Sequence, residues 1–291
     1  MPSKAYVIGR RYIDFCIRRS YRNLCVKGLE NIPDGAVIFA PNHTNTIMDP
    51  LILLQCFKSP TMFGARADMF SNKSLARLMT FFRIVPMVRA KDGLRNVEHN
   101  RSTMDVVCRG LEHGVPFCLF PEGTHRAQEG LLPLKKGVYR IAIESGAPVV
   151  PVAICYSDFF HFRGNCTIKF GEPIDATAFD DPREMLATLS EKMIALQEPV
   201  SGPAKMPMAI ALPLRVAAGA VAFPQLIAAH FLVGMFKDKA WANSMRFLCK
   251  FVLAPLTVLV WLIVFFISPS VITGALLLFS PFAQSLFYDT L

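Results

Sequence analysis

Two short clusters of polar residues carry the chemistry that this sequence predicts. In the segment Pro41–Pro50, five residues separate His43 from Asp49, so a carboxylate can orient an imidazole that deprotonates a hydroxyl near neutral pH. The segment Phe120–Arg126 combines a carboxylate, a glycine, a hydroxyl and a guanidinium. Those groups suit a polyol phosphate, since arginine can bind phosphate oxygens through two parallel hydrogen bonds. A base beside a phosphate site indicates that a phosphorylated alcohol is the nucleophile.

Both members of the first pair also have a structural alternative. His43 could satisfy a backbone group at the end of a strand, although the second cluster makes the role of a base the stronger interpretation. Asp49 precedes Pro50 and an apolar run, which is also the pattern of a helix N-cap. The two roles of Asp49 are compatible, because a carboxylate has two oxygens.

The two clusters, in this order, resemble those of the glycerolipid acyltransferases, which act on glycerol 3-phosphate or 1-acylglycerol 3-phosphate. Three further blocks follow the family's order: Phe63–Arg66, Ile84–Arg89 and Val149–Ile154. Two features depart from the usual pattern. Five residues rather than four separate His43 from Asp49, as in one branch of the family. His125 stands where the family usually has arginine, and Arg126 follows one place later.

The resemblance implies transfer of a fatty acyl group from a thioester to a hydroxyl, with His43 as the catalytic base and Asp49 as its partner. It also implies that the acceptor is bound by Arg66, Glu122, Gly123, Thr124 and Arg126. The acyl donor would be acyl-CoA or acyl-carrier protein, used as a substrate. Neither a cofactor nor a metal is expected, because the six histidines lack metal-ligand spacing and no glycine-rich nucleotide loop occurs.

Two other functions are compatible with these residues. One is a non-catalytic protein on the same fold that binds lipid or organises membranes, and the longer His43–Asp49 spacing is the feature that would favour it. The other is an acyltransferase for a different lysolipid. A lipid esterase is disfavoured, because the sequence has no Gly-x-Ser-x-Gly nucleophile elbow.

Charge and hydropathy favour a lipid bilayer as a partner over nucleic acid. The chain has 291 residues, a net charge of +9 and 53% hydrophobic residues, and no nucleic-acid-binding motif is present. Residues 1–23 are basic and amphipathic, which predicts a helix that either lies on the bilayer interface or packs on the domain. No cleavable signal peptide is expected, and dispersed cysteines are typical of a reducing compartment. The catalytic domain is therefore expected to face the cytosol.

Alternating strand and helix patterns predict an α/β domain at residues 24–198, with a mixed, largely parallel sheet flanked by helices. A linker rich in proline is expected at residues 199–207. Strands are expected at Leu24–Gly28, Ala36–Ala40, Thr61–Gly64, Ile84–Val88, Val115–Phe120, Ala147–Cys155 and Cys166–Phe170. Helices are expected at Pro50–Phe57, Arg95–Gly114, Gly137–Glu144 and Pro182–Gln197.

Residues 208–291 are predicted to form a C-terminal hydrophobic membrane region of helices. The runs Phe247–Ile267 and Val271–Phe287 approach the roughly 20 residues of a membrane-crossing helix, so they predict a hairpin that crosses the bilayer and returns. The run Met208–Phe236 contains Arg215 and two prolines, and it is expected to enter and leave the bilayer on one side. The protein is thus predicted to be integral to a membrane or tightly bound to it.

Overall fold

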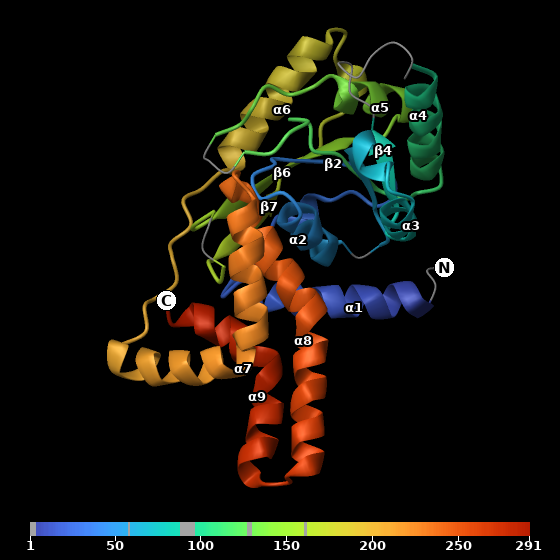
Figure 1. Ribbon diagram of the computed structural model, residues 1–291. Helices are drawn as coiled ribbons and strands as arrows, with labels where there is room; N and C mark the ends of the chain where they lie inside the picture. The colour runs from blue at the N-terminus through green and yellow to red at the C-terminus, as the bar shows by residue number, and fades with distance from the viewer. Residues whose placement is uncertain (1–3, 58, 88–96, 127–129, 160–161) are drawn as a thin grey trace.

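The computed structural model describes residues 4–57, 59–87, 97–126, 130–159 and 162–291. In this part of the chain, a seven-stranded sheet forms the centre of the N-terminal domain (Figure 1). The strands are β1 (Leu24–Lys27), β2 (Ile38–Pro41), β3 (Met62–Arg66), β4 (Ile84–Met87), β5 (Phe117–Cys118), β6 (Val149–Tyr156) and β7 (Cys166–Phe170). Their order is β1-β7-β6-β2-β5-β3-β4, and all neighbours are parallel except β6 and β7. The predicted mixed, largely parallel sheet is confirmed.

Helices cover both faces of this sheet. On one face, α1 (Lys4–Arg18), α2 (Met48–Cys56) and α8 (Ala242–Ile267) share an apolar cluster with the strands. On the other face, α4 (Val97–Glu112), α5 (Gly137–Ser145) and α6 (Pro182–Leu196) pack on a second cluster. Strand β2 sends Phe39 into the first cluster and Ile38 and Ala40 into the second, as the alternation of side chains in a strand requires. The strand that leads to His43 is therefore buried on both sides.

One helix of the domain was not predicted, α3 (Lys73–Phe81), which follows β3. Its start is marked by Asn72, whose side chain accepts hydrogen bonds from the backbone N–H groups of Ser74 and Leu75. Much of its apolar surface is exposed, as at Leu78. Leu75, Leu78 and Met79 follow the i, i+3, i+4 spacing of an apolar helix face, so this pattern and the N-cap together could have revealed the helix.

Helix α1 packs on the domain and also leaves apolar residues exposed. Tyr6, Ile13 and Ile17 are buried, whereas Ile8 is 68% exposed and Phe15 is 41% exposed. The sequence left open whether this helix packs on the domain or lies on a bilayer. One face of α1 packs on the domain, and its outer face carries the apolar residues that would contact a bilayer.

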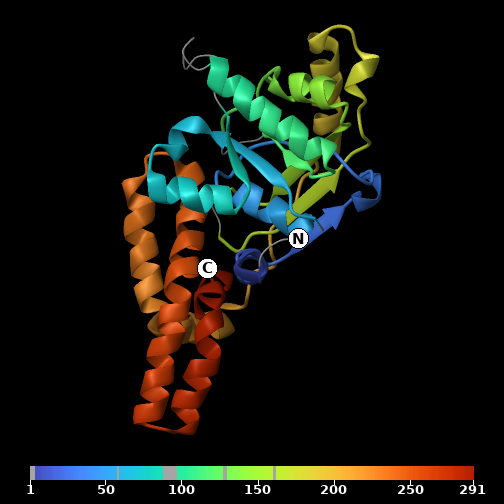
Figure 2. The ribbon, with the colours of Figure 1, turned by 90° about the vertical axis from the view of Figure 1, so that its right-hand side faces the viewer.

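Three long apolar helices form the C-terminal region, α7 (Met208–Met235), α8 and α9 (Val271–Asp289), and each is long and apolar enough to cross a membrane. Figures 1 and 2 show α8 and α9 as an antiparallel hairpin that projects from the domain, and in Figure 1 the first part of α7 extends sideways from it. Helix α7 continues through Pro213 and Pro224, and it is bent in Figure 1. The interruption predicted in this run is a bend within one helix.

Polar contacts fasten the base of the hairpin to the α/β domain. The guanidinium of Arg163 forms an ion pair with Asp289 at the end of α9, with Nε 2.8 Å from Oδ1. Lys250 of α8 is buried, donates a hydrogen bond to Ser20 Oγ at 2.8 Å, and lies over the ring of Phe162. The first turns of α8 and the last turns of α9 are thus part of the domain's surface layer.

Candidate active site

Three parallel strands bring most of the predicted site residues to one edge of the sheet. Strand β2 pairs with β5, and β5 pairs with β3, all in parallel. His43 follows β2, Glu122 follows β5, and Arg66 is the last residue of β3. Because parallel strands end at the same edge, the two clusters meet there although Arg66, His43 and Glu122 are far apart in sequence. Ligands of open α/β sheets bind at such carboxyl ends.

His43 and Asp49 form a hydrogen-bonded pair. The imidazole Nδ1 lies 2.8 Å from Asp49 Oδ2, and the Asp49 side chain is completely buried. The same carboxylate oxygen accepts hydrogen bonds from the backbone N–H groups of Thr44 and Asn45, both at 2.8 Å. The longer His43–Asp49 spacing therefore does not separate the two side chains, because the intervening loop folds back onto the carboxylate.

The helix-capping alternative for Asp49 is wrong. Helix α2 begins at Met48, its N-cap residue is Ile47, and no side chain caps it. Asp49 lies inside the first helical turn, where a negative charge also interacts favourably with the helix dipole. Its carboxylate accepts from loop N–H groups that precede the helix. Pro50 consequently occupies the third position of the helix, not the first as predicted.

A tyrosine from the neighbouring strand completes the surroundings of Asp49. The hydroxyl of Tyr156, at the end of β6, donates to Asp49 Oδ1 at 2.5 Å. Burial raises the pKa of Tyr156 well above its ordinary value, and the nearby Asp49 carboxylate raises the pKa further. The phenol therefore stays protonated and acts as a permanent donor. Both oxygens of Asp49 are held in place, so the carboxylate cannot rotate away from the imidazole.

The ring of His43 is held between aromatic groups at a partly open position. It stacks on Phe120, with ring centroids 4.1 Å apart and an angle of 27° between the rings. The edge of His125 approaches it at 5.6 Å between centroids. The His43 side chain remains 17% exposed. Since Nδ1 is bonded to Asp49, Nε2 is the ring nitrogen that could exchange a proton with a substrate.

Glu122 connects the two polar clusters. Its Oε1 accepts from the backbone N–H of His43 at 2.7 Å, and its Oε2 accepts from that of Leu132 at 2.9 Å. The residue is only 3% exposed, and burial raises the pKa of its carboxyl, while the hydrogen bonds and the nearby charges of His43 and Arg126 act to lower it. Both oxygens are bonded to backbone groups, so the geometry favours a role in holding loops over direct contact with a substrate.

Of the remaining predicted residues, Gly123, Thr124 and Arg126 lie on the same loop, and Arg66 ends β3. Gly123 has a φ of +68°, a left-handed conformation that favours glycine, and Thr124 is exposed beside it. Arg126 is tied to the base, because its backbone N–H donates to the carbonyl oxygen of His43 at 3.1 Å. The half-exposed guanidinium of Arg66 forms an ion pair with Asp68. Of the matching block at Ile84–Arg89, Val88 and Arg89 lie outside the described residues.

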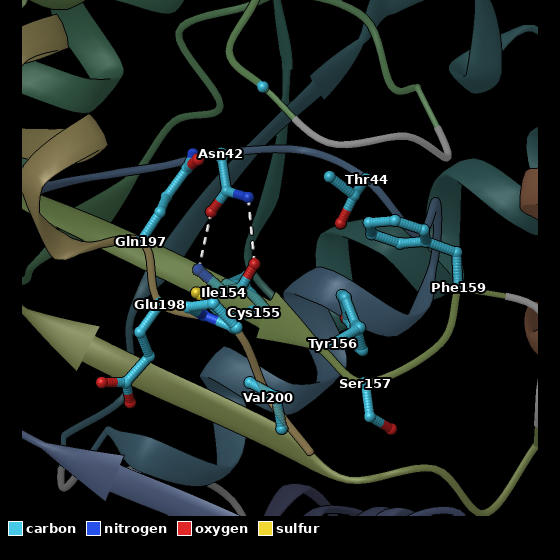
Figure 3. A pocket seen from close by; sticks show the side chains of 12 residues that line it. Asn42, Thr44, Ile154, Cys155, Tyr156, Ser157, Phe159, Gln197, Glu198 and Val200 are labelled. Atoms are coloured by element: carbon cyan, nitrogen blue, oxygen red, sulfur yellow. Dashed lines mark hydrogen bonds between the residues drawn. The ribbon is translucent and has the colours of Figure 1, made fainter. Parts of the chain in front are cut away.

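A cavity of about 280 Å³ lies beside the His43 loop (Figure 3). Asn42 fixes one wall, because its side chain accepts a hydrogen bond from the N–H of Ile154 and donates one to the carbonyl of the same residue. Thr44 also lines the cavity, and its buried Oγ1 has no hydrogen-bond partner among the residues that the structure describes. The cavity is therefore lined by the residues on either side of His43 in the sequence, whereas His43 itself is not among the lining residues.

Several residues around the site could not be found by inspecting the two clusters. Tyr156 belongs to a strand more than 100 positions after Asp49, and its hydroxyl gives no local signal. Asp238 lies 3.0 Å from His125 Nε2, and Ser244 contacts Thr46, although both belong to the C-terminal region. Thr46 has a φ of +31°, a conformation that costs a β-branched residue about 1–3 kcal/mol. Such strain persists only where neighbouring contacts impose it.

Comparisons with known proteins agree with these findings. Residues 23–155 match a family model described as Acyltransferase. A chloroplastic 1-acyl-sn-glycerol-3-phosphate acyltransferase of Brassica napus is 30% identical over 131 residues, which are 44% of this chain and 36% of that protein. A 1-acyl-sn-glycerol-3-phosphate acyltransferase of Haemophilus influenzae is 34% identical over 113 residues, 35% of this chain and 46% of that protein. The chain thus spans less than half the length of these two curated relatives.

A solved structure extends the comparison to the fold. The crystal structure of the 1-acyl-sn-glycerophosphate acyltransferase from Thermotoga maritima matches with a TM-score of 0.52 and 25% identity, over 66% of this chain and 80% of that one. The segment that matches the family model, residues 23–155, contains both polar clusters. These comparisons support the predicted resemblance of residues 23–155 to the glycerolipid acyltransferase family.

Proposed function

We propose that this protein is a membrane-bound O-acyltransferase of phospholipid biosynthesis. It would move a fatty acyl group from acyl-CoA or acyl-carrier protein to the free hydroxyl of 1-acylglycerol 3-phosphate or glycerol 3-phosphate. The observation that carries this proposal is the 2.8 Å contact between His43 Nδ1 and the fully buried Asp49 carboxylate. The names of the relatives favour 1-acylglycerol 3-phosphate as the acceptor.

The proposed reaction uses His43 as a general base and then as a general acid. Asp49 accepts a hydrogen bond from Nδ1–H and fixes the tautomer in which Nε2 is unprotonated, so Nε2 can take the proton of the acceptor hydroxyl. The acceptor oxygen then attacks the thioester carbonyl carbon and forms a tetrahedral oxyanion. When the C–S bond breaks, the ester carbonyl reforms and the imidazolium returns its proton to the departing thiolate. Asp49 stabilises the imidazolium while it exists.

Arginines at the same sheet edge supply the positive charge that a phosphorylated acceptor needs. Arg126 is fixed to the His43 loop through its backbone, so its side chain would bind phosphate at a defined distance from the base. Arg66 ends a strand two places from β2 in the sheet and would provide a second contact. Gly123 and Thr124 form the exposed part of the Phe120–Arg126 loop, where the polyol would lie.

The proposal includes the bilayer because the acceptor is a lipid and the C-terminal helices are apolar. Exposed side chains at the tip of the hairpin include Phe266, Ile267, Val271 and Ile272, which are 72–90% exposed. Burying such residues in hydrocarbon is favourable by about 25 cal/mol per Å². The non-catalytic alternative rested on the longer His43–Asp49 spacing, and the direct contact between these residues removes that reason for preferring it.

The test is transfer of a radiolabelled acyl chain by the purified protein in lipid nanodiscs. Acceptors would include 1-acylglycerol 3-phosphate, glycerol 3-phosphate and neutral lysolipids, each with acyl-CoA and with acyl-carrier protein as donor. His43→Ala should lower the rate by about 10²–10⁴-fold while the protein remains folded, since a general base contributes about that much. His113→Ala, an exposed histidine on the turn after α4, is the matched control. Activity of His43→Ala above about a tenth of wild type would refute the assignment of the base.

A further inference from the structure

The segment between α7 and α8 contacts three loops that surround the proposed active site. We call residues 236–244, which include the first three residues of α8, the α7–α8 turn. Ser244 of this turn bonds to the loop that carries His43 and Asp49, Asp238 lies 3.0 Å from His125 Nε2, and Asn243 donates to the carbonyl of Phe159 at 2.8 Å. These contacts join a segment far outside residues 23–155 to the loops around the base.

The contact with the catalytic loop is a chain of hydrogen bonds. The N–H of Ile47 donates to Ser244 Oγ at 3.2 Å, and Ser244 Oγ lies 2.5 Å from Thr46 Oγ1. Thr46 Oγ1 in turn donates to the carbonyl of Ala240 at 3.4 Å. The order is self-consistent, because each hydroxyl accepts one hydrogen bond and donates another. Thr46 and Ser244 are both buried, so water does not substitute for these bonds.

The chain of hydrogen bonds acts on the strained residue of the loop. Thr46 has a φ of +31°. In the sequence it lies between Thr44 and Asn45, which donate N–H groups, and Asp49, whose carboxylate accepts from them. If Thr46 relaxes, those N–H groups move, and the carboxylate then loses two of the donors that fix it beside His43. Ser244 opposes this relaxation from outside the loop.

The same turn also shapes the far side of the His43 ring. Trp241 meets the edge of His125, with centroids 6.0 Å apart and an interplanar angle of 88°, and it stacks on Phe236 at 5.2 Å. His125 itself lies edge-on to His43. The rings of Trp241 and His125 thus form an aromatic row that runs from the turn to His43. Asp238 contacts His125, the middle ring of this row.

We propose that the α7–α8 turn is a part of the active site, in which Ser244 is a positioning residue for the His43–Asp49 loop. The inference rests on the proposed acyl transfer. It means that the apolar C-terminal helices do more than attach the domain to lipid, because the geometry of the base depends on how they are seated. The loop is strained where it meets Ser244, so loss of that contact should lower the turnover number rather than substrate affinity.

The experiment measures kcat, acceptor KM and Tm for the full chain in nanodiscs. Ser244→Ala and Thr46→Val each remove one hydroxyl of the contact, and each should lower kcat by about tenfold or more with acceptor KM changed less than about threefold. The double variant should be no worse than the poorer single variant by more than about twofold, because both changes break one interaction. Thr46→Ser keeps the hydroxyl and should recover most of the rate.

The matched control breaks a hydrogen bond between α7 and α8 away from the site. Thr257 of α8 accepts from Gln225 of α7 at 2.9 Å, and both residues are buried. Thr257→Val should lower Tm at least as much as Thr46→Val and leave kcat within about twofold of wild type, because it is remote from the loop.

The outcomes separate this inference from the proposed function. A wild type that transfers no acyl chain to any acceptor would remove the proposed function. In an active wild type, normal kcat in both Ser244→Ala and Thr46→Val would overturn the inference alone. A loss of kcat in Thr257→Val equal to that in Thr46→Val would also overturn it, since the effect would then be one of general stability. If Ser244→Ala fails to fold, Thr46→Val and Thr46→Ser still decide the question.

Discussion

Tyr156 donates a hydrogen bond to the oxygen of Asp49 that His43 does not use. The carboxylate is therefore held from both sides, by a phenol on one oxygen and by the imidazole and two backbone N–H groups on the other. Among the described residues, no hydrogen bond joins Tyr156 to the imidazole of His43. Its effect on the reaction should pass through the position and charge of Asp49.

Replacing Tyr156 with phenylalanine should lower both activity and stability. The buried Asp49 oxygen would lose its donor, and a hydrogen bond to a charged group contributes about 1.5–3 kcal/mol to the free energy of unfolding. We expect kcat to fall by about tenfold, since Asp49 can then rotate. Tyr12→Phe is the control, because its hydroxyl also donates a partly buried hydrogen bond, to the carbonyl of Phe251, on a different part of the domain from Asp49. Equal kcat losses in the two variants would contradict a role at Asp49.

Asp49→Asn and Asp49→Ala should separate the effect of the Asp49 charge on kcat from the effect of its hydrogen bonds on stability. An asparagine can turn its carbonyl oxygen toward the N–H groups of Thr44 and Asn45 and its amide toward the Tyr156 hydroxyl, which can accept. Asp49→Asn should therefore fold, with a Tm near that of wild type, and lose about 10²–10⁴-fold in kcat because the imidazolium has no counter-charge. Asp49→Ala leaves buried N–H groups unpaired and should also unfold at a lower temperature. Full activity of Asp49→Asn, measured in the acyl-transfer assay, would show that charge is unimportant.

Arg126→Ala and Arg66→Ala should mainly raise the KM for the phosphorylated acceptor. Each arginine would bind the phosphate in both ground and transition states, so its removal weakens binding uniformly, by about tenfold or more, with a smaller change in kcat. Arg109→Ala, at an exposed position on α4, provides a matched loss of charge. His125→Ala decides whether His125 or Arg126 binds the acceptor: if His125→Ala alone raises the acceptor KM, His125 has that role. An acceptor KM equal to that of wild type in both arginine variants would remove them from the site.

Glu122 should give stability a recognisable pH dependence. Burial raises the pKa of this carboxyl in the folded protein, with His43 and Arg126 as the charged groups that oppose the shift. A raised folded pKa means that the contribution of Glu122 to stability is present at acid pH and is lost as the pH rises from about 4 through the folded pKa. The Tm of wild type minus that of Glu122→Gln should therefore decrease over this range. A difference that stays constant or grows with pH would contradict the shift.

Both ends of the hairpin should be accessible from the side of the membrane that holds the catalytic domain. Asp238, just before α8, contacts His125, and Asp289, at the end of α9, is paired with Arg163. In a Cys25→Ser background, which removes an exposed native thiol, Lys239→Cys and Leu291→Cys should react with an impermeant reagent from the same side of sealed vesicles. Reaction from opposite sides would refute the hairpin arrangement.

The sequence predicted the sheet well because its strands are short apolar runs between turn residues. Strand β6 is an example, since all eight of its residues are buried and no other element type suits so short an apolar run. The juxtaposition of His43 with Glu122 was also predictable, because both follow parallel strands of one sheet. The roles of these residues stay predictions, although the structure brings them together.

What the sequence could not predict depends on contacts between distant segments. Ser244 lies 198 positions from Thr46, and a serine at the start of an apolar helix looks like any other. The start of α8 was placed at Phe247, five residues late, because Asn243, Ser244 and Arg246 are polar and were excluded from the apolar run. Asn243 and Ser244 contact the domain, whereas Arg246 lies over the ring of Tyr288 in α9. Asp49 was given a second role as a cap because the loop that folds onto it leaves no trace in local sequence.

The docking of Lys250 and Phe251 on the domain shortens the part of the hairpin that is free to enter lipid. Beyond Phe251, whose carbonyl accepts from Tyr12, residues 252–267 of α8 remain, about 24 Å of helix at 1.5 Å per residue. The hydrocarbon core of a bilayer is about 30 Å thick. Seated on the membrane by this base, the hairpin would act as a wedge that ends inside the hydrocarbon and takes up area mainly in the leaflet it enters.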